Sequence, residues 1–229
     1  MVDPGLEMKK CVYTINFGKY DQMREPFKTP GWDYIVFTNN KDIDFCGWEP
    51  RQVKFLYNLP NHLLARYVYI NSHLFVPDYD YSLMIGGQIR PSGDLNEFAE
   101  QFMDFSQYFN MMKHPYRTSI YKEAEIILRE HIDTPENVNP QMERYRNAGF
   151  PDNYGLSACG IIGRRNNKFV SEFNEMWWGE VSNGSYRDQL SFDFVRWTLA
   201  FPVPHYFDYS DTLHHGYFEI RQHGTGKLL

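Results

Sequence analysis

The chain has 229 residues, of which 42% are hydrophobic, and a formal net charge of −6 at neutral pH. A chain of this length can bury a sizeable core, and a single α/β domain is the natural expectation. The acidic balance excludes a general nucleic-acid binder, which would carry a basic surface.

The three cysteines, Cys11, Cys46 and Cys159, are far apart and form no Cys-x-x-Cys pair. This spacing indicates neither a disulfide framework nor a zinc site, and it favours a reducing compartment. Residues 1–7 lack the pattern of a secretory signal, and no run approaches the roughly 18 apolar residues that a membrane span needs. We therefore predict a cytoplasmic protein that does not insert into a membrane.

Two apolar runs near the N-terminus predict buried parallel strands. Residues 10–16 and 33–38 are rich in β-branched and aromatic side chains and are bounded by Gly, Pro and Asn. Residues 17–21 follow the first strand, at the edge where open α/β sheets usually place a ligand. A plain turn is an equally weighted interpretation of this loop.

The later segments alternate between helix-like and strand-like patterns. Helices are predicted over 59–75, 119–132, 135–148, 167–181 and 188–199, and strands over 108–112, 155–165 and 203–207. Another short strand, within residues 77–90, ends in Gly86-Gly87. Glycine at a strand end allows a ligand to approach the backbone closely, although an ordinary tight turn uses the same residues.

Residues 177–191 end one helix, turn sharply and open another with the carboxylate of Asp188 in its first turn. A catalytic site can form at such a turn between two helices. Ser185 and Asp188 also have the spacing of a capping box, in which both side chains satisfy free N–H groups, and this spacing alone favours the cap. Trp177 and Trp178 point about 100° apart on a helix, so at most one of them can easily face a cleft.

Motifs distributed over residues 10–207 carry a family resemblance. They are Tyr13-Thr14, Phe17-Gly18-Lys19-Tyr20-Asp21, residues 33–38, Ala65-Arg66-Tyr67, residues 77–82, His114-Pro115-Tyr116-Arg117, residues 121–125, residues 141–145, Gly149-Phe150-Pro151, Gly155-Leu156, Arg164-Arg165-Asn166, Trp177-Trp178 and residues 187–192. In this order they resemble a family of small GT-A-type glycosyltransferase-like proteins, found in bacterial polysaccharide gene clusters, in viruses and in a plant Golgi branch.

The resemblance implies one GT-A-like (Rossmann-like) α/β domain over residues 1–229, with a mixed, mainly parallel sheet flanked by helices and a polar, flexible tail at 208–229. It implies transfer of a sugar from a nucleotide-diphosphate sugar to a hydroxyl of a glycan or related acceptor, as in polysaccharide biosynthesis. The expected partners are therefore the donor and the acceptor, with no nucleic acid. A protein that keeps this fold but only binds nucleotide or carbohydrate is the alternative.

One motif departs from the family pattern. The family's Asp-Gly-Asn-like triplet, the counterpart of the Asp-x-Asp signature that holds a metal against the diphosphate, reads Gly86-Gly87-Gln88 here. Gln88 can bond a hydroxyl, but it cannot anchor Mg²⁺ or Mn²⁺ as a carboxylate does. We therefore expect that Mn²⁺ or Mg²⁺, if either binds, is not essential, and no metal ligand is assigned. The histidines of the tail fit no tight metal signature.

The charge of the leaving nucleoside diphosphate then requires another cation. Arg66, Arg90, Arg117 and Arg164 are candidates, because a guanidinium fork suits phosphate oxygens.

The resemblance suggests site residues of three kinds. Asp188 is the candidate catalytic carboxylate, which would take the proton of the acceptor hydroxyl in an inverting reaction or orient the donor in a retaining one. The expected donor-binding residues are Thr14, Phe17, Gly18, Tyr20, Asp21, Arg66, Gly86, Gly87 and Gln88. The expected acceptor- or sugar-binding residues are His114, Arg117, Glu123, Trp178, Arg187 and Gln189.

Overall fold

The computed structural model describes residues 8–18, 20–54, 59–208, 210 and 215–223. The strands within this part are β1 (Lys10–Asn16), β2 (Trp32–Thr38), β3 (Glu49–Gln52), β4 (Tyr81–Ile85), β5 (Ile89–Pro91), β6 (Phe109–Lys113), β7 (Ser157–Arg165), β8 (His205–Phe207) and β9 (Phe218–Ile220). The helices are α1 (Asn61–Ile70), α2 (Ser72–Phe75), α3 (Leu95–Phe102), α4 (Ile120–Arg129), α5 (Pro135–Asn147), α6 (Lys168–Ser182) and α7 (Gln189–Thr198).

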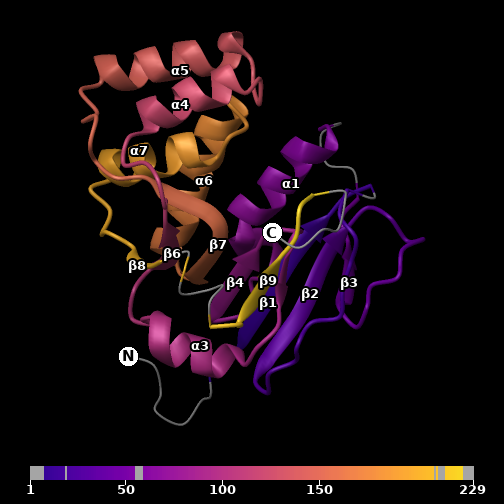
Figure 1. Cartoon of the computed structure of the whole chain (residues 1–229). Helices are drawn as coiled ribbons and strands as arrows, with labels where there is room; N and C mark the ends of the chain where they lie inside the picture. Colours follow the sequence, from indigo (N-terminus) through magenta and orange to yellow (C-terminus); the bar gives the residue numbers. More distant parts are fainter. Residues whose placement is uncertain (1–7, 19, 55–58, 209, 211–214, 224–229) are drawn as a thin grey trace.

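Seven strands form one mixed sheet in the order β3-β2-β1-β4-β7-β6-β8 (Figure 1). β1 runs parallel to β2 and β4, β2 to β3, and β6 to β8, whereas β7 is antiparallel to both of its neighbours. β5 and β9 pair antiparallel as a small second sheet. A mixed, mainly parallel sheet with flanking helices confirms the predicted fold class.

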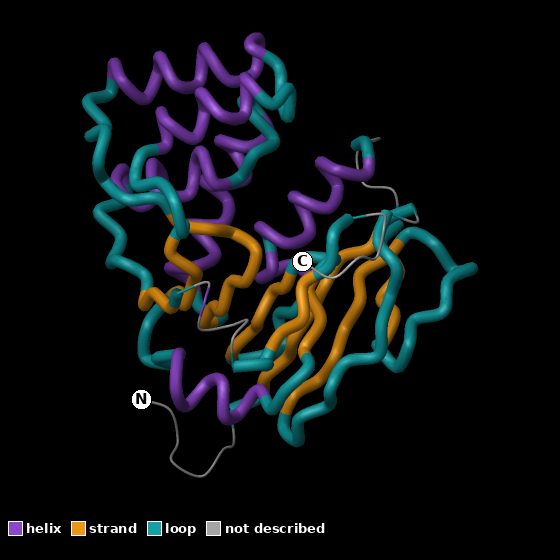
Figure 2. Tube along the Cα trace, viewed as in Figure 1, coloured by secondary structure: helices purple, strands orange, loops and turns teal. Residues whose placement is uncertain are grey.

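Strand side chains alternate between two buried faces, because successive residues point to opposite sides of a sheet. Tyr13 packs in a cluster with residues of α1, α6 and α7, and Val12 packs in another with residues of α3 and β9. A third cluster joins α4 and α5 to α7, and these two helices form the outer layer at the top of Figure 2. The sheet is therefore buried on both faces, which explains why β1 and β2 are apolar along nearly their whole length.

Most of the predicted elements are confirmed. β1 has the predicted bounds, β2 begins one residue earlier than predicted, and α4, α5, α6 and α7 lie inside or close to the predicted ranges. The predicted helix over 59–75 is instead two helices, separated at Asn71. Its backbone leaves the helical region there (φ −87°, ψ 46°), and its side-chain amide donates to the carbonyl of Tyr67 at 3.0 Å.

Four short elements, β3, α3, β5 and β9, were not predicted. β9 lies inside the expected polar tail, and its Phe218 and Ile220 are buried. Other residues of that tail (209, 211–214 and 224–229) lie outside the described part of the chain. Among the helices that the structure describes, each is too short or too polar to cross a lipid bilayer.

Candidate functional site

Four segments meet at one edge of the large sheet. β1 and β4 are parallel, so residues 17, 18, 20 and 21, which follow β1, and the Gly86-Gly87-Gln88 turn, which follows β4, lie at the same edge. The backbone N–H of Gly86 donates to the carbonyl of Gly160 at 2.9 Å, which joins β7 to this turn. β6 is antiparallel to β7, so His114 also follows its strand at this edge. The predicted site residues that follow β1, β4 and β6 therefore come from segments that the sheet topology brings together.

Asp188 lies just before α7 and is 4% exposed. Its Oδ1 atom is 3.3 Å from Nε of Arg66, on α1. Burial raises the pKa of Tyr69 and of the Cys159 thiol well above their ordinary values, and the negative charge of Asp188 acts in the same direction on both. The Asp188 carboxylate is therefore buried, is paired with Arg66, and lies close to the Tyr69 phenol and the Cys159 thiol.

The expected capping box is not formed. Asp188 makes no side-chain cap hydrogen bond to α7. The hydroxyl of Ser185 donates instead to Oδ2 of Asp133 at 2.6 Å and accepts the N–H of Arg187 at 3.1 Å. Asp133, just before α5, accepts the hydrogen bond of the Ser185 hydroxyl, the group that a capping box would use. The carboxylate of Asp188 therefore has no capping role to account for its position.

A second group of polar side chains surrounds Glu123, which is 4% exposed in the first turn of α4. Its Oε2 accepts a short hydrogen bond from Nε of Arg117, and its Oε1 accepts from Nε2 of Gln189 at 2.5 Å. Nε2 of His114 is 3.7 Å from the same Oε2 atom. Gln189 follows Asp188 in the chain, so this group adjoins the Asp188–Arg66 pair.

His114 is held as a hydrogen-bond acceptor. Its Nδ1 atom accepts the backbone N–H groups of Tyr116 at 3.2 Å and Arg117 at 3.1 Å. Burial lowers the pKa of His114, Glu123 acts to raise it, and Arg117 acts to lower it. A neutral imidazole that accepts at Nδ1 carries its proton on Nε2, which lies 3.7 Å from Oε2 of Glu123 and 3.4 Å from Nη2 of Arg117.

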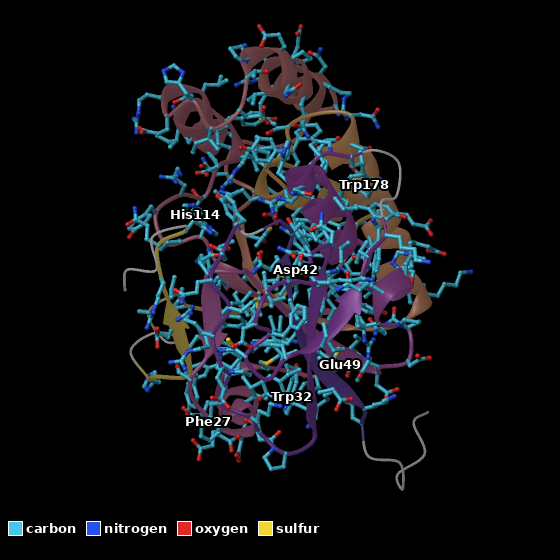
Figure 3. The ribbon with its side chains drawn as sticks, turned by 90° about the vertical axis from the view of Figure 1, so that its right-hand side faces the viewer. Phe27, Trp32, Asp42, Glu49, His114 and Trp178 are labelled. Carbon is cyan, nitrogen blue, oxygen red and sulfur yellow. The ribbon has the colours of Figure 1, made fainter. Side chains whose placement is uncertain are left out.

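The two remaining residues expected at the acceptor side lie differently. The Trp178 ring packs edge-on against Tyr67, with centroids 5.0 Å apart, and Figure 3 shows Trp178 and His114 on opposite sides of the upper half of the molecule. It is Trp177, fully buried, that donates its indole N–H to the carbonyl of Asp188 at 3.0 Å. The Nε atom of Arg187 is buried and has no partner among the described residues.

The Gly86-Gly87-Gln88 turn packs against Asp21. A Cβ atom on Gly87 would lie 2.5 Å from Oδ2 of Asp21 and 3.2 Å from the carbonyl oxygen of Ile15. Nδ1 of His223 lies 3.0 Å from Oδ1 of Asp21. The hydroxyl of Thr14 is buried without a partner among the described residues, and it lines a small pocket next to Gly87. Asp21 and Thr14 are thus placed at the predicted edge.

The other residues of the loop after β1 that were expected at the donor side lie in different surroundings. Phe17 is buried in the core cluster of α1 and α6. Gly18 has φ +71° and is held by Asn39, whose side-chain oxygen accepts its N–H at 2.8 Å. Tyr20 is 65% exposed and its ring lies 5.2 Å from that of His223.

The four candidate arginines separate into different roles. Arg164 is fully buried, and its Nη1 donates to the carbonyls of Tyr69 at 2.6 Å and Ile70 at 3.0 Å, so it supports the core. Arg66 and Arg117 pair with the two carboxylates described above. Arg90 contacts Glu219 on β9, together with two arginines that sequence analysis missed, Arg24 and Arg221.

Among the described residues, the side chains at the turn do not form a complete set of protein ligands for a divalent metal. Asp21 lies beside Gly87 and is paired with His223, and the described part of the chain contains no group of three or more His, Cys, Asp or Glu side chains that could hold an ion. At nucleotide sites Mg²⁺ is bound through one or two carboxylates together with phosphate oxygens of the substrate, and the carboxylate at this turn, Asp21, is paired with His223.

These observations define an α/β protein with a polar site at the edge of a mainly parallel sheet. The model of the TOD1/MUCI70 glycosyltransferase-like domain family matches residues 65–214. The chain belongs to this family. The matched segment contains Arg66, the glycine turn, Glu123 and Asp188.

Comparison with functionally curated proteins gave no match. Among solved structures, the chain is similar to the apo structure of the bifunctional glycosyltransferase WbbM, with 11% sequence identity and a TM-score of 0.46. The similarity covers 84% of this chain and 38% of that one. The chain thus spans less than two fifths of that protein.

Proposed function

We propose that the chain is a glycosyltransferase that moves a sugar from a nucleotide-diphosphate sugar to a hydroxyl of a glycan or related acceptor. The observation that carries this proposal is the buried carboxylate of Asp188, paired with Arg66 and free of any capping role, at the sheet edge. Membership of a glycosyltransferase-like family supports it. The three cysteines are free, in keeping with the cytoplasmic location that we also propose.

In the inverting form of the reaction, Asp188 accepts the proton of the acceptor hydroxyl while that oxygen attacks the anomeric carbon. The bond from this carbon to the phosphate oxygen breaks, and the nucleoside diphosphate leaves with the electron pair. Arg66 holds Asp188 in place as its ion-pair partner. The group around Glu123 adjoins Asp188 through Gln189, and we assign it to the acceptor or the transferred sugar.

A second function has one observation in its favour. The Gly86-Gly87-Gln88 turn has no carboxylate for a metal, so the chain could bind nucleotide or carbohydrate without transferring sugar. The two functions differ in whether nucleoside diphosphate is released.

The test incubates the chain with a panel of nucleotide-diphosphate sugars and glycan acceptors, with Mn²⁺ and with EDTA, and measures the release of nucleoside diphosphate. We expect release with one class of donor, and we expect it to persist in EDTA. Thermal unfolding with each donor gives an independent readout, since a ligand at 100 times its Kd adds about 2.7 kcal/mol to the apparent stability. A donor that stabilises the chain without any release would favour the binding protein, and the absence of both effects would contradict both functions.

A further inference from the structure

Three arginines from distant parts of the chain converge on one carboxylate. Oε1 of Glu219 lies 2.6 Å from Nη1 of Arg24 and 2.6 Å from Nε of Arg221, and its Oε2 makes a short contact with Nη2 of Arg90. The side chains of Arg24 and Glu219 are only 12% and 19% exposed. Three guanidinium groups around one carboxylate leave an excess of positive charge in a partly buried place.

The arginines act on one another as like charges. Burial lowers the pKa of Arg24, and Arg221 and Arg90 act in the same direction against the opposing effect of Glu219. Burial acts to raise the pKa of Glu219, but its hydrogen bonds to Arg90 and Arg221 outweigh this and lower it. A second anion would relieve the repulsion among the arginines, because an opposite charge at close range favours the charged form of each.

The arginine cluster adjoins the glycine turn. The carbonyl oxygen of Gln88 accepts from Nη2 of Arg24 at 2.8 Å and from the backbone N–H of Arg221 at 3.0 Å. Two small pockets share Arg24 and Gly87, and one of them is also lined by Arg90 and Thr14.

Two residues that line the second pocket, Thr14 and Arg90, carry polar atoms without partners among the described residues. The Nε atom of Arg90 and the hydroxyl of Thr14 are buried and make no hydrogen bond within the described part of the chain. Buried polar groups are normally satisfied, so each of these atoms is available to a ligand. The other pocket is lined by Asp21, which lies against Gly87, and also by Arg24 and Arg221. The negative charge of Asp21 would disfavour a phosphate group next to it, so phosphate groups would lie nearer to the arginines.

We propose that Arg24, Arg90 and Arg221 bind the diphosphate of the donor without a metal, and that Glu219 occupies the position of a phosphate oxygen in the ligand-free protein. This inference rests on the proposed function, because it names the residues that would hold the donor. Guanidinium groups suit the role, since their planar forks match phosphate oxygens and remain charged. When the diphosphate binds, it replaces the Glu219 carboxylate as the anionic partner of the three arginines.

The alternative is that the cluster only fastens the small β5–β9 sheet to the segment around Arg24. The two explanations differ in the effect of Glu219→Gln. If Glu219 competes with a ligand anion, the neutral and equally large glutamine should strengthen anion binding. If the cluster is only structural, no gain in affinity is expected.

The test measures the binding of inorganic pyrophosphate and of uridine, guanosine, adenosine and cytidine diphosphates by calorimetry in EDTA. We expect Arg221→Gln to weaken binding roughly tenfold or more, the range for a lost charge-assisted hydrogen bond. We expect Glu219→Gln to strengthen it several-fold. Arg144→Gln and Glu180→Gln are matched controls, because this ion pair of 2.7 Å lies between α5 and α6. Both controls should bind as the wild type does.

Thermal unfolding of every variant shows whether it is folded, and the Glu219→Gln result stands by itself if Arg221→Gln does not fold. Unchanged affinity in both variants, weaker binding in Glu219→Gln, or a wild type that binds none of the probes in EDTA would overturn the inference. Sugar transfer with arginine-independent binding would refute this inference alone. Arginine-dependent binding without transfer would refute only the proposed function.

Discussion

The carboxylate of Asp21 occupies the space beside Gly87, so that a Cβ atom there would lie only 2.5 Å from Oδ2. This contact explains why residue 87 is glycine, and the explanation does not require a ligand. It also joins the loop after β1 to the turn after β4, the two segments that sequence analysis assigned separately to donor binding. The glycine in the family's metal triplet position is therefore part of how the edge of the sheet is built.

Gly87→Ala should lower the free energy of unfolding by about 1–3 kcal/mol, the usual cost of overpacking a well-filled site. The displaced atoms include the backbone carbonyl oxygen of Ile15, which cannot move as a flexible side chain does. Gly179→Ala in α6 is the control, since nothing lies within 4 Å of its added Cβ. It should stabilise the helix by roughly 0.5–1 kcal/mol. Urea unfolding of both variants checks the prediction, and a neutral Gly87→Ala would contradict the close contact.

Asp188→Asn should reduce sugar transfer by roughly 10²–10⁴-fold, the contribution of a general base. Asparagine would gain no stability here as a helix cap, because the Asp188 side chain does not cap α7. Loss of the negative charge leaves Arg66 without its ion-pair partner. Since the Arg66 side chain is 24% exposed, we expect a loss of only about 1–3 kcal/mol in stability.

The measurement for Asp188→Asn is the rate of nucleoside diphosphate release at a temperature where the variant remains folded by circular dichroism. Glu180→Gln serves as the control, because this carboxylate also pairs with an arginine, Arg144, but makes no hydrogen bond or ion pair with Asp188 or Arg66 within the described part of the chain. It should keep its activity. A fully active Asp188→Asn variant would remove Asp188 from the catalytic role.

The sequence predicts the elements whose residues share a local pattern. β1 and α4 carry long apolar runs or strong helical periodicity, and both lie where predicted. β3 has the sequence Glu-Pro-Arg-Gln and is an outermost strand of the large sheet. Its residues carry no apolar pattern that would predict a strand. The short strand β9 is defined by pairing with β5, more than a hundred residues earlier, which a local pattern cannot show.

The same limit applies to the site. His114, Arg117 and Glu123 are within ten residues of one another, and their side chains contact one another. Their role in binding the acceptor or sugar stays a prediction. Arg24 and Glu219 are 195 positions apart, and Arg24 lies in a loop without a motif. The capping box failed for a related reason, because Asp133 competes for the Ser185 hydroxyl from 52 positions away. The roles assigned to Arg187 and to the donor loop stay predictions.

Glu123→Ala should lower the free energy of unfolding by about 2–4 kcal/mol, because it leaves the charge of Arg117 and the amide of Gln189 without their buried partner. Glu125→Ala on the same helix is the control. The Glu125 side chain is 62% exposed and pairs only with Lys122, so its removal should change stability by less than about 0.5 kcal/mol. Chemical denaturation of both variants decides the question, and equal effects would contradict the buried cluster around Glu123.

His114 should make the stability of the folded chain depend on pH. Burial holds its pKa below the ordinary value of 6.5, with Arg117 adding to this effect and Glu123 opposing it. As pH falls through 6.5, the unfolded chain takes up a proton at this position before the folded chain does, so the contribution of His114 to stability is present above 6.5 and is lost below it. In His114→Asn the side-chain oxygen can accept the same two backbone N–H groups but cannot titrate. The free energy of unfolding of the wild type, measured in urea relative to this variant, should therefore fall between about pH 7.5 and about pH 5.5. A difference that stays constant, or that grows at low pH, would show that His114 is not held neutral beside Glu123.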